Sequence, residues 1–300
     1  MKKLFLCVGA AKSGTTWLYQ NIRANPGLWF TPEKELHYHF SIHGRFDRLT
    51  PEIREGKLER YRKWMAEPGR KASRMEERLE WYRRFAAGPV DDAWYRSLFD
   101  GMPEDAWACD FSPSTALLPD AGWASVAAFA PEIRIVYILR EPEERLWSHA
   151  KFHAAFINQL DAFKAMKPAE MQRFINRFSL TEDGDYGDHL RRILAHIPRE
   201  NVLLLEYAEI SKAPVNALRR VEAHLGLGPT PERDGKLEER INVSEKMPKP
   251  RGFGRSHRAR FRREMKLLVE QGVEFARPWA ELHSPGPARW RRLLAEALER

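Results

Sequence analysis

A short stretch near the start of the chain combines small residues, hydroxyl groups and one lysine, a combination suited to binding anions. It reads Gly9-Ala10-Ala11-Lys12-Ser13-Gly14-Thr15-Thr16-Trp17 and follows an apolar run at residues 4–8. Small residues let backbone N–H groups approach a phosphate or sulfate, and a helix starting after the loop adds partial positive charge. We therefore expect a cofactor-binding loop made of Lys12, Ser13, Gly14, Thr15, Thr16 and Trp17.

The position of the lysine argues against the usual ATP-binding form of such a loop. That form is G-x4-G-K-[ST], in which the lysine follows the second glycine. Here Lys12 precedes Gly14 by two residues. Taken alone, the segment also fits a strand-to-helix turn that contains glycine and binds no ligand.

An arginine after a second apolar run is a candidate for binding another phosphate. Residues 133–139 are almost wholly apolar, Arg140 follows them, and Ser148 stands eight residues later in a helical pattern. The arginine can make charge-assisted hydrogen bonds to a phosphate, and the serine can add a hydroxyl. By itself, an arginine at a strand end is more often part of a surface ion pair.

In this order and spacing, the two motifs resemble those of sulfotransferases that use 3′-phosphoadenosine 5′-phosphosulfate (PAPS). The resemblance covers about residues 2–25, 106–148 and 185–227. It implies that the first loop binds the 5′-phosphosulfate, and that Arg140 and Ser148 bind the 3′-phosphate. It also implies a transferase of EC 2.8.2 type that needs PAPS as co-substrate and no metal. Lys12 would stabilise the charge on the departing nucleotide, as lysine does in phosphoryl transfer.

The acceptor hydroxyl or amine needs a general base, and residues 34–40 contain the candidates. They read Lys-Glu-Leu-His-Tyr-His-Phe, which resembles the K-E-P-H-[FY]-F stretch of heparan-type and many bacterial members. In those members the glutamate is the base, which assigns the role to Glu35. Leu36 replaces the proline, and His39 is inserted before the final phenylalanine. His37 and His39 stay rival bases, because steroid- and phenol-type members use a histidine.

A basic, glycine-containing loop at residues 246–255 loosely resembles the family's loop that closes over the nucleotide. Within it, Arg251 and Gly252 are the expected cofactor contacts. Only two cysteines occur, Cys7 and Cys109, so the cysteine pair of many carbohydrate sulfotransferases is missing. The low cysteine content excludes a disulfide framework and favours the cytoplasm.

Alternating strands and helices have to position these motifs. Apolar runs predict buried strands at residues 4–8, 107–111, 133–139 and 201–206,. Helical patterns follow at residues 15–25, 121–129, 143–156, 187–196 and 215–225, whereas residues 28–50 look like a loop. The alternation predicts an α/β fold, a P-loop-type three-layer sandwich with a central parallel sheet. We expect one domain over residues 1–300, with a helical insertion at about 51–99 and a basic C-terminal helical lobe at about 246–300.

Composition narrows the class of protein further. The chain has 300 residues, of which 43% are hydrophobic and 31% charged, with a net charge of +8. These values exclude wholesale disorder and an integral membrane protein, and no apolar run approaches the roughly 20 residues of a membrane span. The basic residues of the tail are mixed with apolar ones at helical spacing, which favours a solvated helix over a nucleic-acid interface. The sequence leaves the oligomeric state open.

The insertion at residues 51–99 is the expected wall of the acceptor site. Between Arg54 and Arg84 it has 11 basic and 6 acidic residues, together with Trp64, Trp81 and Tyr82. Aromatic faces pack on sugar rings while basic side chains bind carboxylates or sulfates, so an anionic carbohydrate is the expected acceptor. The alternative is that these aromatic residues form the buried stripe of a helical hairpin.

Two other functions stay open at this point. One is a nucleotide kinase or another P-loop transferase, which would need magnesium ligands and the usual lysine. The other is a basic module that binds nucleic acid or an anionic polysaccharide. His149 and His153 stand four apart in a helical pattern, but no carboxylate accompanies them in the zincin manner, so we expect no metal site,.

Overall fold

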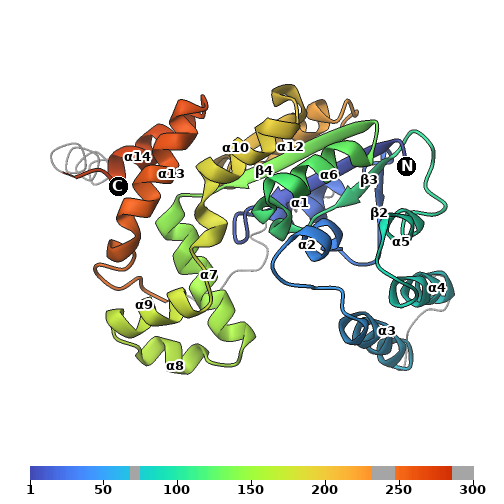
Figure 1. The fold of residues 1–300 in the computed structure, drawn as a ribbon, viewed down its shortest axis with the longest axis horizontal. Helices are drawn as coiled ribbons and strands as arrows, with labels where there is room; N and C mark the ends of the chain where they lie inside the picture. The colour runs from blue at the N-terminus through green and yellow to red at the C-terminus, as the bar shows by residue number, and fades with distance from the viewer. Residues whose placement is uncertain (68–74, 231–246, 286–300) are drawn as a thin grey trace.

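A single parallel sheet forms the centre of the described chain. The structure, a computed structural model, describes residues 1–67, 75–230 and 247–285. Within these residues the strand order is β2-β3-β1-β4-β5, and every neighbouring pair is parallel (Figure 1). The strands are β1 (Lys3–Gly9), β2 (Leu28–Phe30), β3 (Trp107–Asp110), β4 (Glu132–Leu139) and β5 (Val202–Glu206). The predicted α/β fold with a central parallel sheet is confirmed.

Helices cover both faces of the sheet because its strands are apolar on both sides. In β1, Leu4, Leu6 and Val8 belong to one core cluster, while Phe5 and Cys7 belong to another. This alternation is the two-residue period of a strand. On the first face pack α6 (Asp120–Phe129), α10 (Tyr186–His196) and α13 (Arg258–Glu270); on the second pack α1 (Thr15–Ile22) and α12 (Pro214–His224). The result is the expected three-layer sandwich.

Outside residues 68–74, which are not described, the insertion forms three helices that extend the first core. They are α3 (Pro51–Met65), α4 (Met75–Ala86) and α5 (Asp92–Ser97). Tyr61, Trp81 and Tyr82 are buried in the same cluster as the side chains of β1. The buried-stripe alternative is therefore right, and these rings do not form a sugar-binding wall.

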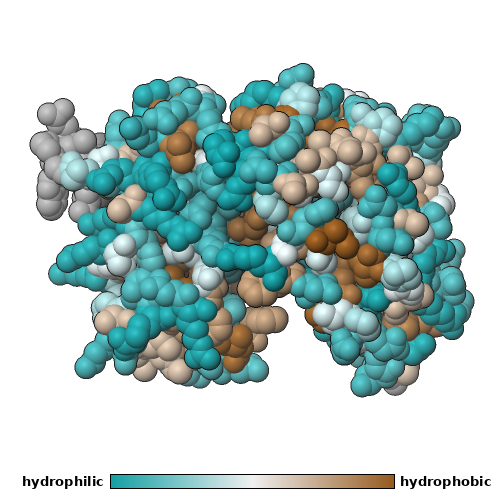
Figure 2. All heavy atoms as spheres, in the orientation of Figure 1, coloured by the Kyte–Doolittle hydropathy of each residue, from teal (hydrophilic) through white to brown (hydrophobic). Residues whose placement is uncertain are grey.

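A second group of helices lies on the other side of the molecule in Figure 1. Here α7 (Pro142–Phe156) leads to α8 (Leu160–Ala165) and α9 (Pro168–Arg177). Phe163 and Phe174 pack with Phe253 and Phe261 from the C-terminal part of the chain. The last element of the described residues is α14 (Arg277–Leu282). Figure 2 shows the surface hollowed between this group and the insertion. No helix in the described ranges is long and apolar enough to cross a membrane.

The expectation of a loop over residues 28–50 is wrong in two places. β2 is a three-residue edge strand that pairs with β3, Leu28 opposite Trp107. The helix α2 (Tyr38–His43) follows shortly afterwards. The helices α8, α9 and α11 (Tyr207–Lys212) were also not predicted. β2, α2, α8 and α11 have six residues or fewer, too few for a clear hydrophobic period. α9 is longer, and its buried Met171, Phe174 and Ile175 do have helical spacing, so this helix could have been predicted.

Burial keeps His39 neutral in the core. Its ring contacts Tyr38, Tyr95 and Phe129, and neither ring nitrogen has a hydrogen-bond partner among the described residues. Burial lowers the pKa of His39 from 6.5 to about 3. The unfolded chain therefore binds a proton at this position at pH values where the folded chain does not.

This difference predicts how stability depends on pH. The free energy of unfolding should fall as the pH drops from about 6.5 towards 3, because protons then favour the unfolded state,. His39→Phe should flatten this dependence, by up to about 1.4 kcal/mol per pH unit. Urea unfolding at several pH values between 6.5 and 4 measures the slope. An unchanged slope would show that His39 is not the titrating group.

Candidate functional site

A cavity of about 1420 Å³ opens where β1 and β4 end. In parallel α/β sheets, ligands bind outside the carboxyl ends of the strands, where neighbouring connections diverge to opposite faces. The cavity is lined by the loop after β1, the start of α1, residues before α2, one face of α7, and parts of α11 and residues 247–249. Its volume exceeds the roughly 1,000 Å³ of a large single-ligand pocket. It has room for a nucleotide and a second substrate.

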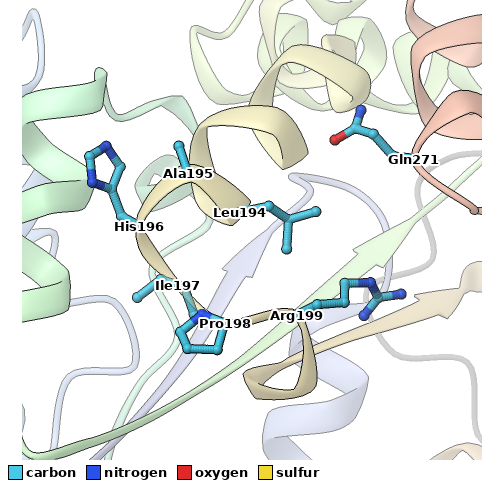
Figure 3. Close-up of a pocket in the computed structure, with 7 residues that line it drawn as sticks. All are labelled: Leu194, Ala195, His196, Ile197, Pro198, Arg199 and Gln271. Atoms are coloured by element: carbon cyan, nitrogen blue, oxygen red, sulfur yellow. The ribbon is translucent and has the colours of Figure 1, made fainter.

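A smaller hollow of about 490 Å³ lies at the opposite edge of the sheet. Figure 3 shows its lining residues between the end of α10 and Gln271. Most of them are apolar or aliphatic, and they lie near the amino end of β5. None of the motifs that could do chemistry reaches this hollow.

The backbone of the loop after β1 favours glycine at position 14. Gly14 caps α1 with φ 97°, and an added Cβ would lie 3.3 Å from the side chains of Tyr207 and Ile210. Lys12 also has a positive φ, of 69°. The first N–H groups of a helix have no intrahelical acceptor, and Gly14, Thr15, Thr16 and Trp17 all line the cavity. The start of α1 is therefore suited to an anion.

Ser13 does not lie on the cavity wall, where a phosphate-binding residue was expected. Its side chain is 0% exposed and does not line the cavity. Its backbone N–H donates to the carbonyl of Ala10 at 3.1 Å. The tight turn thus uses the N–H and buries the hydroxyl, so the prediction of a Ser13 phosphate contact lacks support in this geometry.

Four cationic side chains gather around the anion loop. Lys12, Lys34, Arg140 and Lys151 all line the cavity. Burial lowers the pKa of Lys12, and the charges of Arg140, Lys34 and Lys151 lower it further. Arg140 donates to the carbonyl of Lys12 at 3.4 Å, and its guanidinium lies 4.7 Å from the centre of the Tyr207 ring. Together these charges favour a ligand with several negative charges.

Ser148 faces the cavity because of how α7 begins. Pro142 is at the start of the helix, and the Glu141 side chain accepts hydrogen bonds from the N–H groups of Glu143 and Glu144. This cap starts α7 directly after Arg140. Ser148 lies on the same helix face as Glu144, one turn further along, and lines the same cavity as Arg140,. Arg140 and Ser148 thus line one cavity with the loop.

Glu35 lies on the cavity wall between a lysine and a histidine. Its Oε1 is 3.1 Å from Lys34 Nζ, and its Oε2 is 3.3 Å from His37 Nε2. Burial raises the pKa of Glu35, but the His37 hydrogen bond and the Lys34 charge outweigh this effect and lower it to about 2. Glu35 is therefore a carboxylate at neutral pH. Its side chain is 38% exposed, against 16% for His37.

The end of β3 holds His37 in place. The backbone N–H of His37 donates to Ser112 Oγ at 2.8 Å, and its Nδ1 is 2.9 Å from Ser114 Oγ. Ser112 in turn donates to Asp110 at 2.5 Å, and Tyr95 donates to the same carboxylate at 3.1 Å. Both ring nitrogens of His37 thus have a polar neighbour, and the ring is held beside Glu35.

Comparison with known proteins identifies the family. Residues 5–231 match the family model described as the sulfotransferase family, which is more than half of the chain. The chain belongs to the sulfotransferase family.

Solved structures agree with the fold of this sulfotransferase. The sulfotransferase from Alicyclobacillus acidocaldarius is 20% identical, with a TM-score of 0.60, over 91% of this chain and 96% of that one. The sulfotransferase domain from the Synechococcus PCC 7002 olefin synthase is 14% identical, with a TM-score of 0.51, over 100% and 96% of the two chains. A search of curated proteins finds no match. At these identities the structures show a shared fold.

Lys34 is a site residue that the sequence reasoning missed. Its Nζ lies 3.3 Å from Thr15 Oγ1 and 3.2 Å from Thr16 Oγ1, in addition to its contact with Glu35. It therefore links the anion loop of the sulfotransferase to the proposed base. Its place beside Glu35 was visible in the motif, but its reach to α1 depends on the fold.

The insertion supports the segment that contains Glu35. Glu33 accepts hydrogen bonds from Lys57 Nζ at 2.7 Å and from Tyr82 Oη at 2.8 Å. None of the described residues of the insertion lines the cavity. The described part of the insertion therefore supports the segment that contains Glu35 and lies off the cavity wall.

Two further expectations need correction. His39, a rival base, is 1% exposed within the aromatic core and does not line the cavity. Arg251 and Gly252 are exposed and also lie off the cavity, because Phe253 packs on Trp147 and turns them outwards. Met247, Pro248 and Lys249 line it instead; Lys246 lies outside the described residues.

His149 and His153 also line the cavity, but they do not form a metal site among the described residues. His149 Nδ1 is 3.1 Å from Arg145 and 3.5 Å from Asp183. Burial lowers the pKa of His149 to about 4. The neighbouring guanidinium makes this histidine a poor ligand for a cation.

Removing the charge of Lys34 should change the titration of Glu35. In Lys34→Met, the pKa of Glu35 should rise from about 2 by about one pH unit or more, because a nearby opposite charge has been lost,. Carbon NMR of labelled glutamate carboxyl groups measures it, with Glu35→Gln to assign the signal. Lys57→Met, which removes a contact of Glu33, is the matched control. An unchanged pKa in Lys34→Met would exclude the electrostatic link.

Proposed function

We propose that this sulfotransferase transfers a sulfuryl group from PAPS to a hydroxyl or amine of an acceptor. The observation that carries the proposal is the gathering of Lys12, Lys34, Arg140 and Lys151 around one cavity. PAPS has negative charge at three places: its sulfate, its 5′-phosphate and its 3′-phosphate. Such a donor would neutralise a cluster whose members otherwise repel one another.

The residues present fit this donor. In the proposal the start of α1 and Lys12 bind the 5′-phosphosulfate, and Arg140 and Ser148 bind the 3′-phosphate. Gly14 leaves the backbone free to approach an anion, and Arg140 is already held by the loop carbonyl and the Tyr207 ring. Lys249, which pairs with Glu143 at 3.0 Å, lies on the same wall as a further cation. The donor supplies an activated sulfuryl group, and the protein supplies position and charge.

In the proposed reaction Glu35 accepts the proton of the acceptor. The acceptor oxygen or nitrogen forms a bond to sulfur while the bond from sulfur to the 5′-phosphate oxygen breaks. Lys12 stabilises the negative charge that develops on that oxygen. Glu35 is ionised at neutral pH and is more exposed than His37, so its carboxylate is open to the acceptor. His37 then fixes the carboxylate by its hydrogen bond.

A carbohydrate acceptor has less support than the sequence suggested. Its argument rests on charges and rings of the insertion. Arg54 donates to backbone carbonyls at the end of α4, including that of Ala86 at 2.9 Å. Arg83 pairs with Glu76 and Glu80, and Arg84 pairs with Asp100. These side chains have partners within the insertion, so the proposal keeps only a hydroxyl or amine acceptor.

We also propose that residues 1–300 form one domain in the cytoplasm. The insertion shares its core cluster with β1, which supports one domain. Cys7 and Cys109 are buried free thiols, which agrees with a reducing compartment,. The positive charges described above gather inside a cavity rather than on an open face, which supports a small anionic ligand over nucleic acid.

Nucleotide binding tests the donor. Adenosine 3′,5′-bisphosphate at about 100 times its Kd should raise the melting temperature by about 5 °C or more without magnesium, whereas ATP should not. Arg140→Ala should weaken bisphosphate binding at least about 10-fold in calorimetric titration, since a charge-assisted hydrogen bond is lost. Arg191→Ala, which removes an exposed ion pair with Asp188, is the control. Equal stabilisation by ATP with magnesium would favour a kinase instead.

The base is tested by two variants. Glu35→Gln should bind the bisphosphate normally and lose turnover by about 10²- to 10⁴-fold, the usual contribution of a general base. His37→Ala should lose less, because it removes an orienting contact. Single-turnover rates of sulfated product separate the two roles. An active Glu35→Gln beside an inactive His37→Ala would assign the base to the histidine.

A further inference from the structure

One face of α7 changes from polar to aromatic along its length. Four cavity-lining residues follow one another there at intervals of four: Glu144, Ser148, Phe152 and Phe156. Residues four apart lie on one face of a helix. Arg140 directly follows β4, two residues before α7 begins, and the helix then runs towards α8 and α9 (Figure 1). The polar end is at the proposed donor site, and the aromatic end leads away from it.

The two phenylalanines expose apolar surface where a ligand can reach it. Phe152 is 49% exposed and Phe156 is 75% exposed. Their rings are nearly parallel, at 19°, with centres 6.4 Å apart. Six large apolar side chains are exposed in the described parts of the chain, and of these only Phe152 and Phe156 line the cavity. Exposed rings on a cavity wall are typical of a site for an apolar ligand.

This aromatic surface begins beside the position of transfer. Lys12 Nζ lies 3.9 Å from the centre of the Phe152 ring. Pro113 and Leu117 add apolar lining to the cavity, next to Ser114, which contacts His37. An acceptor placed between Lys12 and Glu35 can extend over these apolar side chains, and His149, Lys151 and His153 of α7 line the same cavity.

We propose that the acceptor is an alcohol or phenol with an apolar body, aromatic or alkyl, and that Phe152 and Phe156 select it. This inference rests on the proposed sulfuryl transfer and deepens it. The acceptor oxygen gains the bond to sulfur, the nucleotide leaves, and the proton goes to Glu35. An aromatic or alkyl body buries apolar surface on both rings, whereas a saccharide places only its C–H faces there and its hydroxyls need other partners.

A homologous series of 4-alkylphenols tests the inference. Lengthening the alkyl chain hardly changes the phenol's acidity, so a change in kcat/KM reports contact with the body of the acceptor. In the wild type, kcat/KM should rise by about fourfold for each methylene, the factor that corresponds to about 0.8 kcal/mol. In Phe156→Ser this rise should flatten and KM for the longest member should increase about 10-fold. Affinity for the bisphosphate should stay the same.

Phe46→Ser is the matched control, because Phe46 is 65% exposed but does not line the cavity. It should keep the wild-type slope. A flat slope in the wild type, an unchanged slope in Phe156→Ser, or faster sulfation of methyl glucoside or cellobiose than of any alkylphenol would overturn the inference. A wild type that binds the bisphosphate but sulfates no alkylphenol overturns this inference alone. A wild type that neither binds the bisphosphate nor forms a sulfated product overturns the proposed function as well.

Discussion

The mutual repulsion of cations around Lys12 is the constraint on which the site depends. Burial and the charges of Arg140, Lys34 and Lys151 all disfavour the protonated form of Lys12. The carboxylate of Glu35 raises the pKa of Lys12, but it offsets this lowering only in part. An anion bound at the start of α1 removes the repulsion and stabilises the loop, so ligand binding and local stability are coupled. The same charges that disfavour protonated Lys12 favour an anionic ligand with several negative charges,.

Rigid strand ends keep these charged groups in place. β1 leads into Lys12, β4 leads into Arg140, and β3 leads into Asp110 and the serines that hold His37. Because the three strands are hydrogen-bonded neighbours, their ends cannot move independently. At these strand ends, Lys34 contacts both Thr15 at the start of α1 and Glu35, the proposed base. The anion loop and Glu35, the proposed base, are therefore fixed relative to each other mainly by the sheet.

The parts of the fold that were predictable from sequence are those with a strong local pattern. β1, β3, β4 and β5 are continuous apolar runs because both faces of the sheet are covered,. β2 has only three residues at the edge, too few to show a period. The site was predictable where a motif is continuous, as at Lys12 or Glu35. It was not predictable where side-chain direction depends on distant packing: Phe253 on Trp147 turns Arg251 away, and Lys34 reaches α1 across 19 residues.

The insertion shows why charge and aromatic content alone are a poor guide to a binding surface. Its rings are needed to close the core, and Arg54 is needed to bind the carbonyls at the end of α4. The insertion affects the site indirectly. Lys57 and Tyr82 donate hydrogen bonds to Glu33, two residues before Glu35, the proposed base. Changes in the insertion should therefore act on the rate through the position of Glu35, not on the affinity for the acceptor. In the proposal, acceptor choice depends instead on the exposed rings of Phe152 and Phe156, which line the cavity beside Lys12.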